Sequence, residues 1–286
     1  MAPLVVIVGP TASGKSNLAV TLAEQFGGEI ICADSRTVYK HMDIGTAKPS
    51  AEDQARVPHW GLDLVEPNEP FSVAKFQEYA NEKIADIRLR GKIPFLVGGT
   101  GLYIDAVIFE YEFGPVDNSL RDKLELLSLE ELHRYCIENN INLPENEKNR
   151  RYVIRAIEQK SINTKRLLEP QHNTIIVGIT TNREILHERI HERSEHIFES
   201  GVVEEAKSLG EKYGWKSEAM TGNIYRLAHD YLNGTITKDE FKQLFETADR
   251  QLAKRQLTWL KRNSFIKWLE LDYAQKYIAR RLVETA

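Results

Sequence analysis

Eight residues near the start of the chain have the types and the spacing of a phosphate-binding loop. Residues 9–16 read GPTASGKS, which fits the pattern Gly-x-x-x-x-Gly-Lys-Ser. Glycines in this pattern let the backbone curl so that its N–H groups face an anion, while the lysine adds a positive charge. The serine hydroxyl is a ligand for Mg²⁺, so we predict a diphosphate or nucleotide site with Mg²⁺ at Ser16. Its residues are Gly9, Pro10, Thr11, Ala12, Ser13, Gly14, Lys15 and Ser16.

Two other polar segments follow short apolar runs. Asp34 and Ser35 come directly after EIICA, and Thr100 comes directly after IPFLVGG. A carboxylate at such a place can act as a general base toward a molecule held on the phosphate loop. Taken alone, Asp34 and Ser35 fit a helix cap or a turn equally well.

The elements that must position these residues alternate between strands and helices. LVVIV before the loop has the pattern of a buried strand, and the apolar spacing after the loop predicts a helix that ends at Gly27 and Gly28. Residues 73–91 repeat a helical pattern, and residues 93–98 follow as another strand. The alternation predicts an α/β fold with a parallel sheet, in which ligands bind beyond the carboxyl ends of the strands. We therefore expect residues 9–16, 34–37 and 98–103 to converge.

The composition and charge of the chain narrow the class of protein, its cellular compartment and its partners. The chain has 286 residues, a net charge of −4 and two cysteines, Cys32 and Cys136, far apart in sequence. This pattern argues against a disulfide framework or a structural zinc site and leads us to expect a cytoplasmic protein. We expect no membrane partner, because no apolar run approaches the length of a membrane helix. Two segments, residues 147–166 and 246–267, are locally basic, so each is either a nucleic-acid contact or a solvated helix face.

The phosphate loop by itself leaves several enzyme classes open. A regulatory GTPase would need Asp-x-x-Gly and Asn-Lys-x-Asp motifs, and the chain has neither. An ATPase strand would end in an acidic metal ligand, whereas the strand at residues 93–98 runs into Gly98 and Gly99. A small-molecule kinase with Asp34 as base and a different transfer from a diphosphate remain equally compatible with the residues.

Five motifs, in order, resemble the tRNA dimethylallyltransferase family. They are GPTASGKS, ADSRTVYKHMDIGTAKP, LVGGTGLYIDA, NRRYVIRAIE and RQLAKRQLTWLKR, and the match runs from about Val5 to about Leu269. The resemblance implies a P-loop NTPase-like parallel sheet flanked by helices, with a small helical insertion domain. It also implies transfer of the dimethylallyl group from dimethylallyl diphosphate to N6 of adenosine 37, beside the anticodon of tRNA.

The resemblance assigns roles to individual residues. Asp34 would be the general base on N6, and Thr100 would position the same amine. The catalytic core would comprise residues 1–113 and 170–286, and residues 114–169 would form an insertion that contacts tRNA. The implied partners are the tRNA anticodon stem-loop and dimethylallyl diphosphate, and we expect a monomer. The residues assigned to tRNA are Asp34, Ser35, Arg36, Thr37, Thr100, Arg121, Arg150 and Arg151.

Some positions depart from the family pattern. Thr37 stands where the family usually has Gln, and Thr221 and Ile224 alter a segment that usually carries Gly-Tyr-Arg or Gly-Tyr-Lys. Residues 187–191 read HERIH, which matches the H-E-x-x-H motif of zinc proteases. Because the segment is densely charged and no third zinc ligand is fixed by spacing, we interpret it as an ordinary charged helix. The alternative functions are an adenylate isopentenyltransferase and a P-loop small-molecule kinase.

Overall fold

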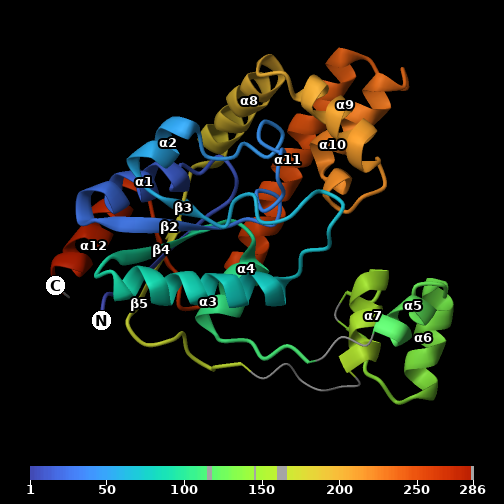
Figure 1. Ribbon diagram of the computed structural model, residues 1–286, viewed down its shortest axis with the longest axis horizontal. Coiled ribbons are helices and arrows are strands. Elements are labelled where there is room, and N and C mark those ends of the chain that lie inside the picture. Colours follow the sequence, from blue (N-terminus) through green and yellow to red (C-terminus); the bar gives the residue numbers. More distant parts are fainter. Residues whose placement is uncertain (115–117, 145, 160–165, 285–286) are drawn as a thin grey trace. The chain divides into compact units, whose positions relative to one another are not determined.

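A six-stranded sheet lies at the centre of the computed structural model, which describes residues 1–114, 118–144, 146–159 and 166–284 (Figure 1). The strand order is β3-β2-β4-β1-β5-β6, and every neighbouring pair is parallel. This confirms the predicted α/β fold with a parallel sheet. The strands are β1 (Leu4–Val8), β2 (Gly28–Ala33), β3 (His59–Trp60), β4 (Ile93–Gly98), β5 (Thr174–Ile179) and β6 (Lys267–Leu269).

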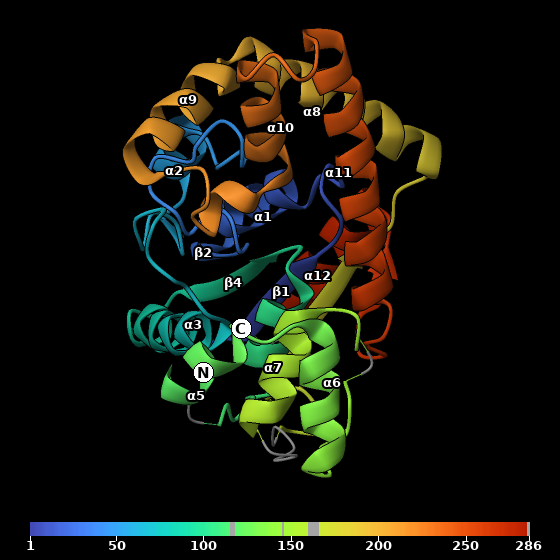
Figure 2. The same cartoon turned by 90° about the vertical axis from the view of Figure 1, so that its right-hand side faces the viewer.

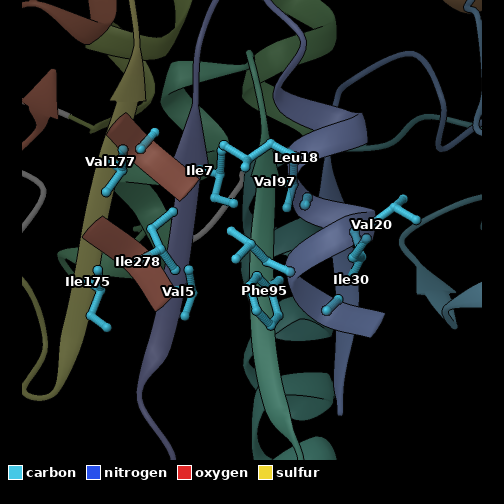
Figure 3. Packing of buried hydrophobic residues seen from close by; sticks show 14 of the residues in the cluster. Val5, Ile7, Leu18, Val20, Ile30, Phe95, Val97, Ile175, Val177 and Ile278 are labelled. Atoms are coloured by element: carbon cyan, nitrogen blue, oxygen red, sulfur yellow. The ribbon is translucent and has the colours of Figure 1, made fainter. Parts of the chain in front are cut away.

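Helices cover both faces of the sheet. On one face, α1 (Lys15–Phe26) and α12 (Leu271–Glu284) pack on the side chains of four central strands, as Figure 3 shows for Val5, Phe95 and Val177. Because side chains alternate along a strand, residues such as Val6 and Leu96 face the other side, where α3 (Val73–Leu89) and α4 (Gly101–Ile108) pack. Burial on both faces explains why the strands are continuous apolar runs.

The helix after the phosphate loop ends at Gly27, as predicted, but Gly28 is not part of that end. Gly27 caps α1 in the left-handed conformation, with φ 66°. Gly28, which we predicted to be part of the helix end, is instead the first residue of β2. A Cβ atom at Gly28 would lie 2.3 Å from the Phe95 ring, so close packing between β2 and β4 is the physical reason for glycine there.

A second helical group lies on one side of the sheet (Figures 1 and 2). It is built from α8 (Arg183–Glu199), α9 (Val202–Tyr213), α10 (Asn223–Leu232) and α11 (Lys238–Leu260). Their apolar faces share one core with Val38, Tyr39 and Met42, which belong to the long loop after β2. The short helix α2 (Ala51–Arg56) packs against α1, and the 3₁₀ helix Ala219–Thr221 packs against α10. The loop after β2 therefore joins the sheet to the helical group.

The chain divides into two compact units. One comprises Met1–Ile108 and Pro170–Ala286, and the other comprises Phe109–Glu169, whereas the sequence placed the first boundary at residue 114. The second unit contains α5 (Asn118–Leu124), α6 (Leu129–Glu138) and α7 (Arg150–Gln159), which bury a small core of their own. Among the described residues, no helix combines the length and the apolar character needed to cross a membrane.

Candidate active site

The phosphate loop occupies the turn from β1 into α1. Gly14 precedes the helix with φ 87°, a conformation that side-chain-bearing residues rarely adopt, and Ala12 also has a positive φ of 60°. The first N–H groups of α1, at Lys15 and Ser16, have no partner within the helix and carry the positive end of its dipole. Both residues line a cavity of about 1070 Å³. This geometry suits an anion at the start of α1.

Lys15 lies against its own loop. Its Nζ donates to the carbonyl oxygen of Pro10 at 3.1 Å. Burial lowers the pKa of Lys15 from 10.5 to about 8, the nearby Asp34 carboxylate opposes that shift, and the Arg193 charge adds to it. The ammonium is thus poorly solvated, so an anion in the cavity would stabilise its charged form.

Two helices distant in sequence hold the phosphate loop. The Thr11 N–H donates to Oε1 of Gln256 on α11 at 2.8 Å. Arg189 on α8 donates from Nη1 to the Ser13 carbonyl oxygen at 3.5 Å. Gln256 and Arg189 had no predicted role, although Gln256 lies within the family-like segment AKRQLTW.

The ends of β2 and β4 bring Asp34 and Thr100 to the same cavity. The Ser35 N–H donates to Oγ1 of Thr100 at 3.1 Å, which ties the two strand ends together. Asp34 Oδ1 accepts the Arg36 N–H at 2.7 Å. Asp34 is half-buried and close enough to Lys15 to influence its pKa.

The structure therefore brings the three predicted segments together. The predicted residues on the wall of the large cavity are Thr11, Ala12, Lys15, Ser16, Asp34, Ser35, Arg36, Thr37 and Thr100. Gly9 and Pro10 are buried behind the wall, and Ser13 and Gly14 line a smaller cavity of about 530 Å³. Gly9 and Pro10 thus shape the turn and are not placed on either cavity.

Arg36 and Thr37 form different parts of the cavity wall. The Arg36 guanidinium donates from Nη1 to the carbonyl oxygens of Glu218 and Ala219, at 3.1 and 3.3 Å. Thr37 is 5% exposed, and its Oγ1 has no hydrogen-bond partner among the residues that the structure describes. A buried hydroxyl without a partner is costly, so a polar ligand atom at this place would relieve the cost.

A carboxylate from α9 fixes the loop that follows. Glu205 accepts the N–H groups of Asp43 and Ile44 at Oε2 (2.8 and 2.7 Å). Its Oε1 accepts the Gly45 N–H at 2.9 Å and the Tyr225 hydroxyl at 2.8 Å. Ile44 and Gly45 line the large cavity, so Glu205 shapes a wall that the sequence did not connect to α9.

Two of the family-like motifs pack against each other where a glycine meets a tryptophan. A Cβ atom at Gly101 would lie 2.0 Å from Cδ1 of Trp259, so glycine lets α11 approach the start of α4. The Trp259 Nε1–H donates to Oδ2 of Asp105 at 2.7 Å. LVGGTGLYIDA and AKRQLTW are therefore two sides of one packing contact.

The predicted tRNA-contacting arginines of the second unit differ in their surroundings. Arg121 Nε lies 3.3 Å from Oε1 of Glu158, whose side chain is fully buried. Arg150 donates from Nη2 to the Glu125 carbonyl oxygen at 2.8 Å, and Arg151 is exposed. Tethering of Arg121 to a buried carboxylate gives it a structural role in this unit.

The residues at the large cavity fit Mg²⁺. Mg²⁺ is usually held by one or two protein oxygens together with substrate phosphates and waters, and Ser16 supplies such an oxygen at the large cavity. No cluster of three or more His, Cys, Asp or Glu suited to a metal occurs in the part of the chain that is described. His191, from the HERIH segment, instead lies 3.1 Å from Glu246.

Comparisons with known proteins agree with these observations. A family model described as IPP transferase matches residues 37–263, and one described as isopentenyl transferase matches residues 2–58. A tRNA dimethylallyltransferase of Pelotomaculum thermopropionicum is 40% identical, over 94% of this chain and 91% of the relative. That of Geobacillus thermodenitrificans is 38% identical, over 97% and 93%.

Solved structures show the same fold. The tRNA isopentenylpyrophosphate transferase of Bacillus halodurans superimposes with a TM-score of 0.77 at 36% identity, covering 99% of this chain and 98% of the other. A eukaryotic dimethylallyltransferase acting on tRNA has a TM-score of 0.79 at 24% identity, covering 95% and 74%, and supports the fold alone. From the family model over residues 37–263 and the relatives aligned along nearly the whole chain, this protein belongs to the tRNA dimethylallyltransferase, or IPP transferase, family.

Proposed function

We propose that this protein transfers the dimethylallyl group of dimethylallyl diphosphate to N6 of adenosine 37 in tRNA. One observation carries the proposal: the phosphate loop and the Asp34 carboxylate face the same cavity, close enough for Asp34 to influence Lys15. A transfer from a diphosphate needs a site that binds the diphosphate and a base that lies close to that site. The names of the relatives support this reaction over phosphoryl transfer.

The phosphate loop would hold the leaving group. As the bond between the allylic carbon and the diphosphate oxygen breaks, its electron pair leaves with the diphosphate. The first N–H groups of α1 and the Lys15 ammonium would stabilise the charge that grows there. The Ser16 hydroxyl would contribute one ligand to Mg²⁺, which when bound neutralises phosphate charge.

Asp34 would accept the proton that the reaction releases. The lone pair of adenine N6 is delocalised into the ring, so the amine is a weak nucleophile. As N6 forms its bond to the allylic carbon, one N6 proton passes to the Asp34 carboxylate. Oδ1 of Asp34 accepts the Arg36 N–H, which orients the carboxylate and leaves Oδ2 for the substrate. Oγ1 of Thr100 accepts the Ser35 N–H and keeps a second lone pair for the other N6 proton.

The acceptor base would have to leave its stack to reach this site. Asp34 is half-buried within the cavity wall, so an adenosine stacked in the anticodon loop must be extruded to reach it. Ser35, Arg36 and Thr37 lie on the wall beside Asp34 and would contact the extruded nucleotide. Arg150 and Arg151 would contact tRNA phosphates from the second unit.

A single experiment separates this function from its alternatives. The protein is incubated with Mg²⁺, dimethylallyl diphosphate and an unmodified tRNA, and the nucleosides are analysed by mass spectrometry. The proposal requires adenosine that has gained one C₅H₈ unit at position 37. Prenylation of free AMP with unmodified tRNA would indicate an adenylate isopentenyltransferase, and ATP-dependent phosphorylation of a small acceptor would indicate a kinase.

The proposed site is contained in one chain. Apart from Gly9 and Pro10, which are buried behind the cavity wall, the residues assigned to the diphosphate or the reacting amine line cavities of the same unit, so we expect an active monomer. Both cysteines are buried free thiols, which supports the proposal that the protein works in the cytoplasm. Activity that persists at concentrations where light scattering gives the monomer mass would support this expectation.

A further inference from the structure

The side-chain amide of Asn223, on the wall of the large cavity, has no hydrogen-bond partner in the described part of the chain. Asn223 is half-buried and is the first residue of α10. The residue that caps this helix is Gly222, so the amide does not serve as the cap. Asparagine is also a weaker helix former than alanine or leucine. Helix formation is therefore a weak reason for an asparagine at this position.

A second polar group without a partner lines the same cavity. Thr37 is 5% exposed, and its Oγ1 accepts from and donates to none of the described residues. It lies three positions after Asp34, the proposed base. A buried hydroxyl and a half-buried amide that both lack protein partners indicate that a polar ligand binds here.

Two contacts place Asn223 beside the loop after β2, which carries the proposed base. The Arg36 guanidinium donates to two consecutive carbonyl oxygens at residues 218–219, at 3.1 and 3.3 Å. A Cβ atom at Gly45 would lie 3.0 Å from Cγ2 of Ile224, the residue after Asn223. The loop and the segment that leads into α10 therefore run side by side between these two contacts.

Adenine, the proposed acceptor, offers partners for two donors. Its reacting N6 amine is flanked by two ring nitrogens, N1 and N7, and both accept hydrogen bonds. A threonine hydroxyl and an asparagine N–H₂ group can donate to such nitrogens, whereas the Asp34 carboxylate cannot. Proteins read extruded bases through hydrogen bonds of this kind along the base edges.

The same two donors would reject cytosine. Cytosine also has an exocyclic amine, but that amine is flanked by one ring nitrogen and one C–H group. With cytosine in the site, one of the two donors would lose its partner, and a buried donor without a partner is costly. Sites built to hydrogen-bond a substrate discriminate strongly against analogues that lack the matching atom.

We propose that Thr37 and Asn223 select adenine as the acceptor, each donating to a different one of the two ring nitrogens that flank N6. Arg36 is the positioning residue that holds the segment carrying Asn223. The proposal rests on the proposed function and deepens it, because it states how the acceptor base is chosen. The competing explanation is that Asn223 only begins α10 and that Arg36 only joins two loops.

The first test measures single-turnover transfer to anticodon stem-loops that carry adenosine, 1-deazaadenosine or 7-deazaadenosine at position 37 of the RNA. Each analogue replaces one ring nitrogen by C–H and so removes one acceptor. The measured quantity is the ratio of the adenosine rate to the analogue rate, compared between parent and variant. This comparison cancels the altered reactivity of N6 in the analogue and any loss of folded protein.

We expect Asn223→Ala to lower this ratio about three- to tenfold for one analogue, and Thr37→Val to lower it by a similar factor for the other. Asn233→Ala is the matched control, because Asn233 is an exposed asparagine at the other end of α10 and lines neither cavity. It should keep both parent ratios. Parent-like ratios in Asn223→Ala, or loss for the same analogue in both variants, would overturn the proposal.

The second test examines Arg36. Arg36→Met removes the donor to residues 218–219 but leaves Asn223 in the chain. We expect it to lose about the same discrimination as Asn223→Ala, and the double variant to lose no more than either single variant. A uniform loss of RNA affinity for all three bases, with unchanged ratios, would indicate a direct RNA contact and would overturn the positioning role.

Binding without transfer separates this proposal from the proposed function. Dissociation constants of the three stem-loops are measured by fluorescence anisotropy in the presence of inorganic diphosphate and Mg²⁺. If the protein discriminates among them through Thr37 and Asn223 yet never modifies RNA, the proposed function is wrong and the selection of adenine stands. If transfer occurs and both variants keep the parent ratios, the selection is wrong and the proposed function stands.

Discussion

Replacing Glu205 by Gln tests how the cavity wall at residues 43–45 is held. The two carboxylate oxygens of Glu205 accept four hydrogen bonds, three from the backbone of this loop and one from Tyr225. Each oxygen faces two donors. A glutamine keeps one acceptor oxygen and presents an amide N–H₂ in place of the other, so two donors would then face a donor.

The expected cost follows from the bonds that are lost. Two charge-assisted hydrogen bonds at about 1.5 kcal/mol each make about 3 kcal/mol. Glu205 belongs to α9 and the loop follows β2, so these hydrogen bonds attach the loop to α9. We therefore expect Glu205→Gln to lower the free energy of loop opening by this amount. At about 1.4 kcal/mol per factor of ten, the loop would open about 100-fold more often.

Hydrogen exchange of the amides at residues 43–45 measures this directly. We expect exchange about 100-fold faster in Glu205→Gln, with a lower kcat/KM because Ile44 and Gly45 line the cavity. The neighbouring exposed Glu204 on the same helix provides the control, and Glu204→Gln should exchange like the parent protein. Parent-like protection of residues 43–45 in Glu205→Gln would refute the reasoning.

Three further outcomes are expected. Affinity for inorganic diphosphate should fall as pH rises through about 8, where Lys15 loses its charge, and calorimetry at several pH values should show this fall in the parent but not in Lys15→Met. Hydrogen bonds from Arg90 first, and from Lys92 and Trp60, lower the pKa of buried Glu29 from 4.5 to about 2 despite its burial. Its carboxylate therefore stabilises the fold above about pH 4.5 by about 2–3 kcal/mol, and denaturant titrations should show this advantage over Glu29→Gln shrinking as pH falls toward 2. Gly101→Ala should lower the melting temperature, at a cost of about 1–3 kcal/mol from overpacking against Trp259, while Gly114→Ala, where a Cβ atom meets nothing within 4 Å, should not.

The fold could be predicted because its signals are local. Buried parallel strands such as LVVIV are continuous apolar runs, and the helix after the phosphate loop has an apolar stripe of the right period. The end of that helix at Gly27 is confirmed, but Gly28 belongs to β2, where the need for glycine arises from Phe95, a residue on another strand. A local pattern cannot reveal which distant side chain will occupy the space above a glycine.

The candidate site was predictable only where its residues follow strand ends. Asp34 and Thr100 meet because β2 and β4 are parallel neighbours, which the alternation of strands and helices implies. Gln256 and Arg189 reach the site from helices that begin more than 160 residues after the phosphate loop. Their hydrogen bonds depend on how α8 and α11 pack, which no local pattern specifies.

For Arg121, the sequence suggested a role but did not reveal its contact within the fold. Its charge and its place in the helical insertion led to a predicted tRNA contact, and that contact stays a prediction. The structure adds that its Nε lies beside the buried carboxylate of Glu158. An arginine beside a buried acid helps to offset that acid's desolvation, as Arg155 also does for Glu158, whether or not it touches a phosphate.

The most direct test is single-turnover transfer by Asp34→Asn, with dimethylallyl diphosphate and saturating tRNA mixed in a quench-flow instrument. Asparagine has nearly the shape of aspartate but cannot accept a proton, so the rate of adenosine modification should fall about 10²- to 10⁴-fold. Dissociation constants for tRNA and for inorganic diphosphate should stay close to those of the parent protein. A single-turnover rate within about threefold of the parent would contradict a role for Asp34 as the base.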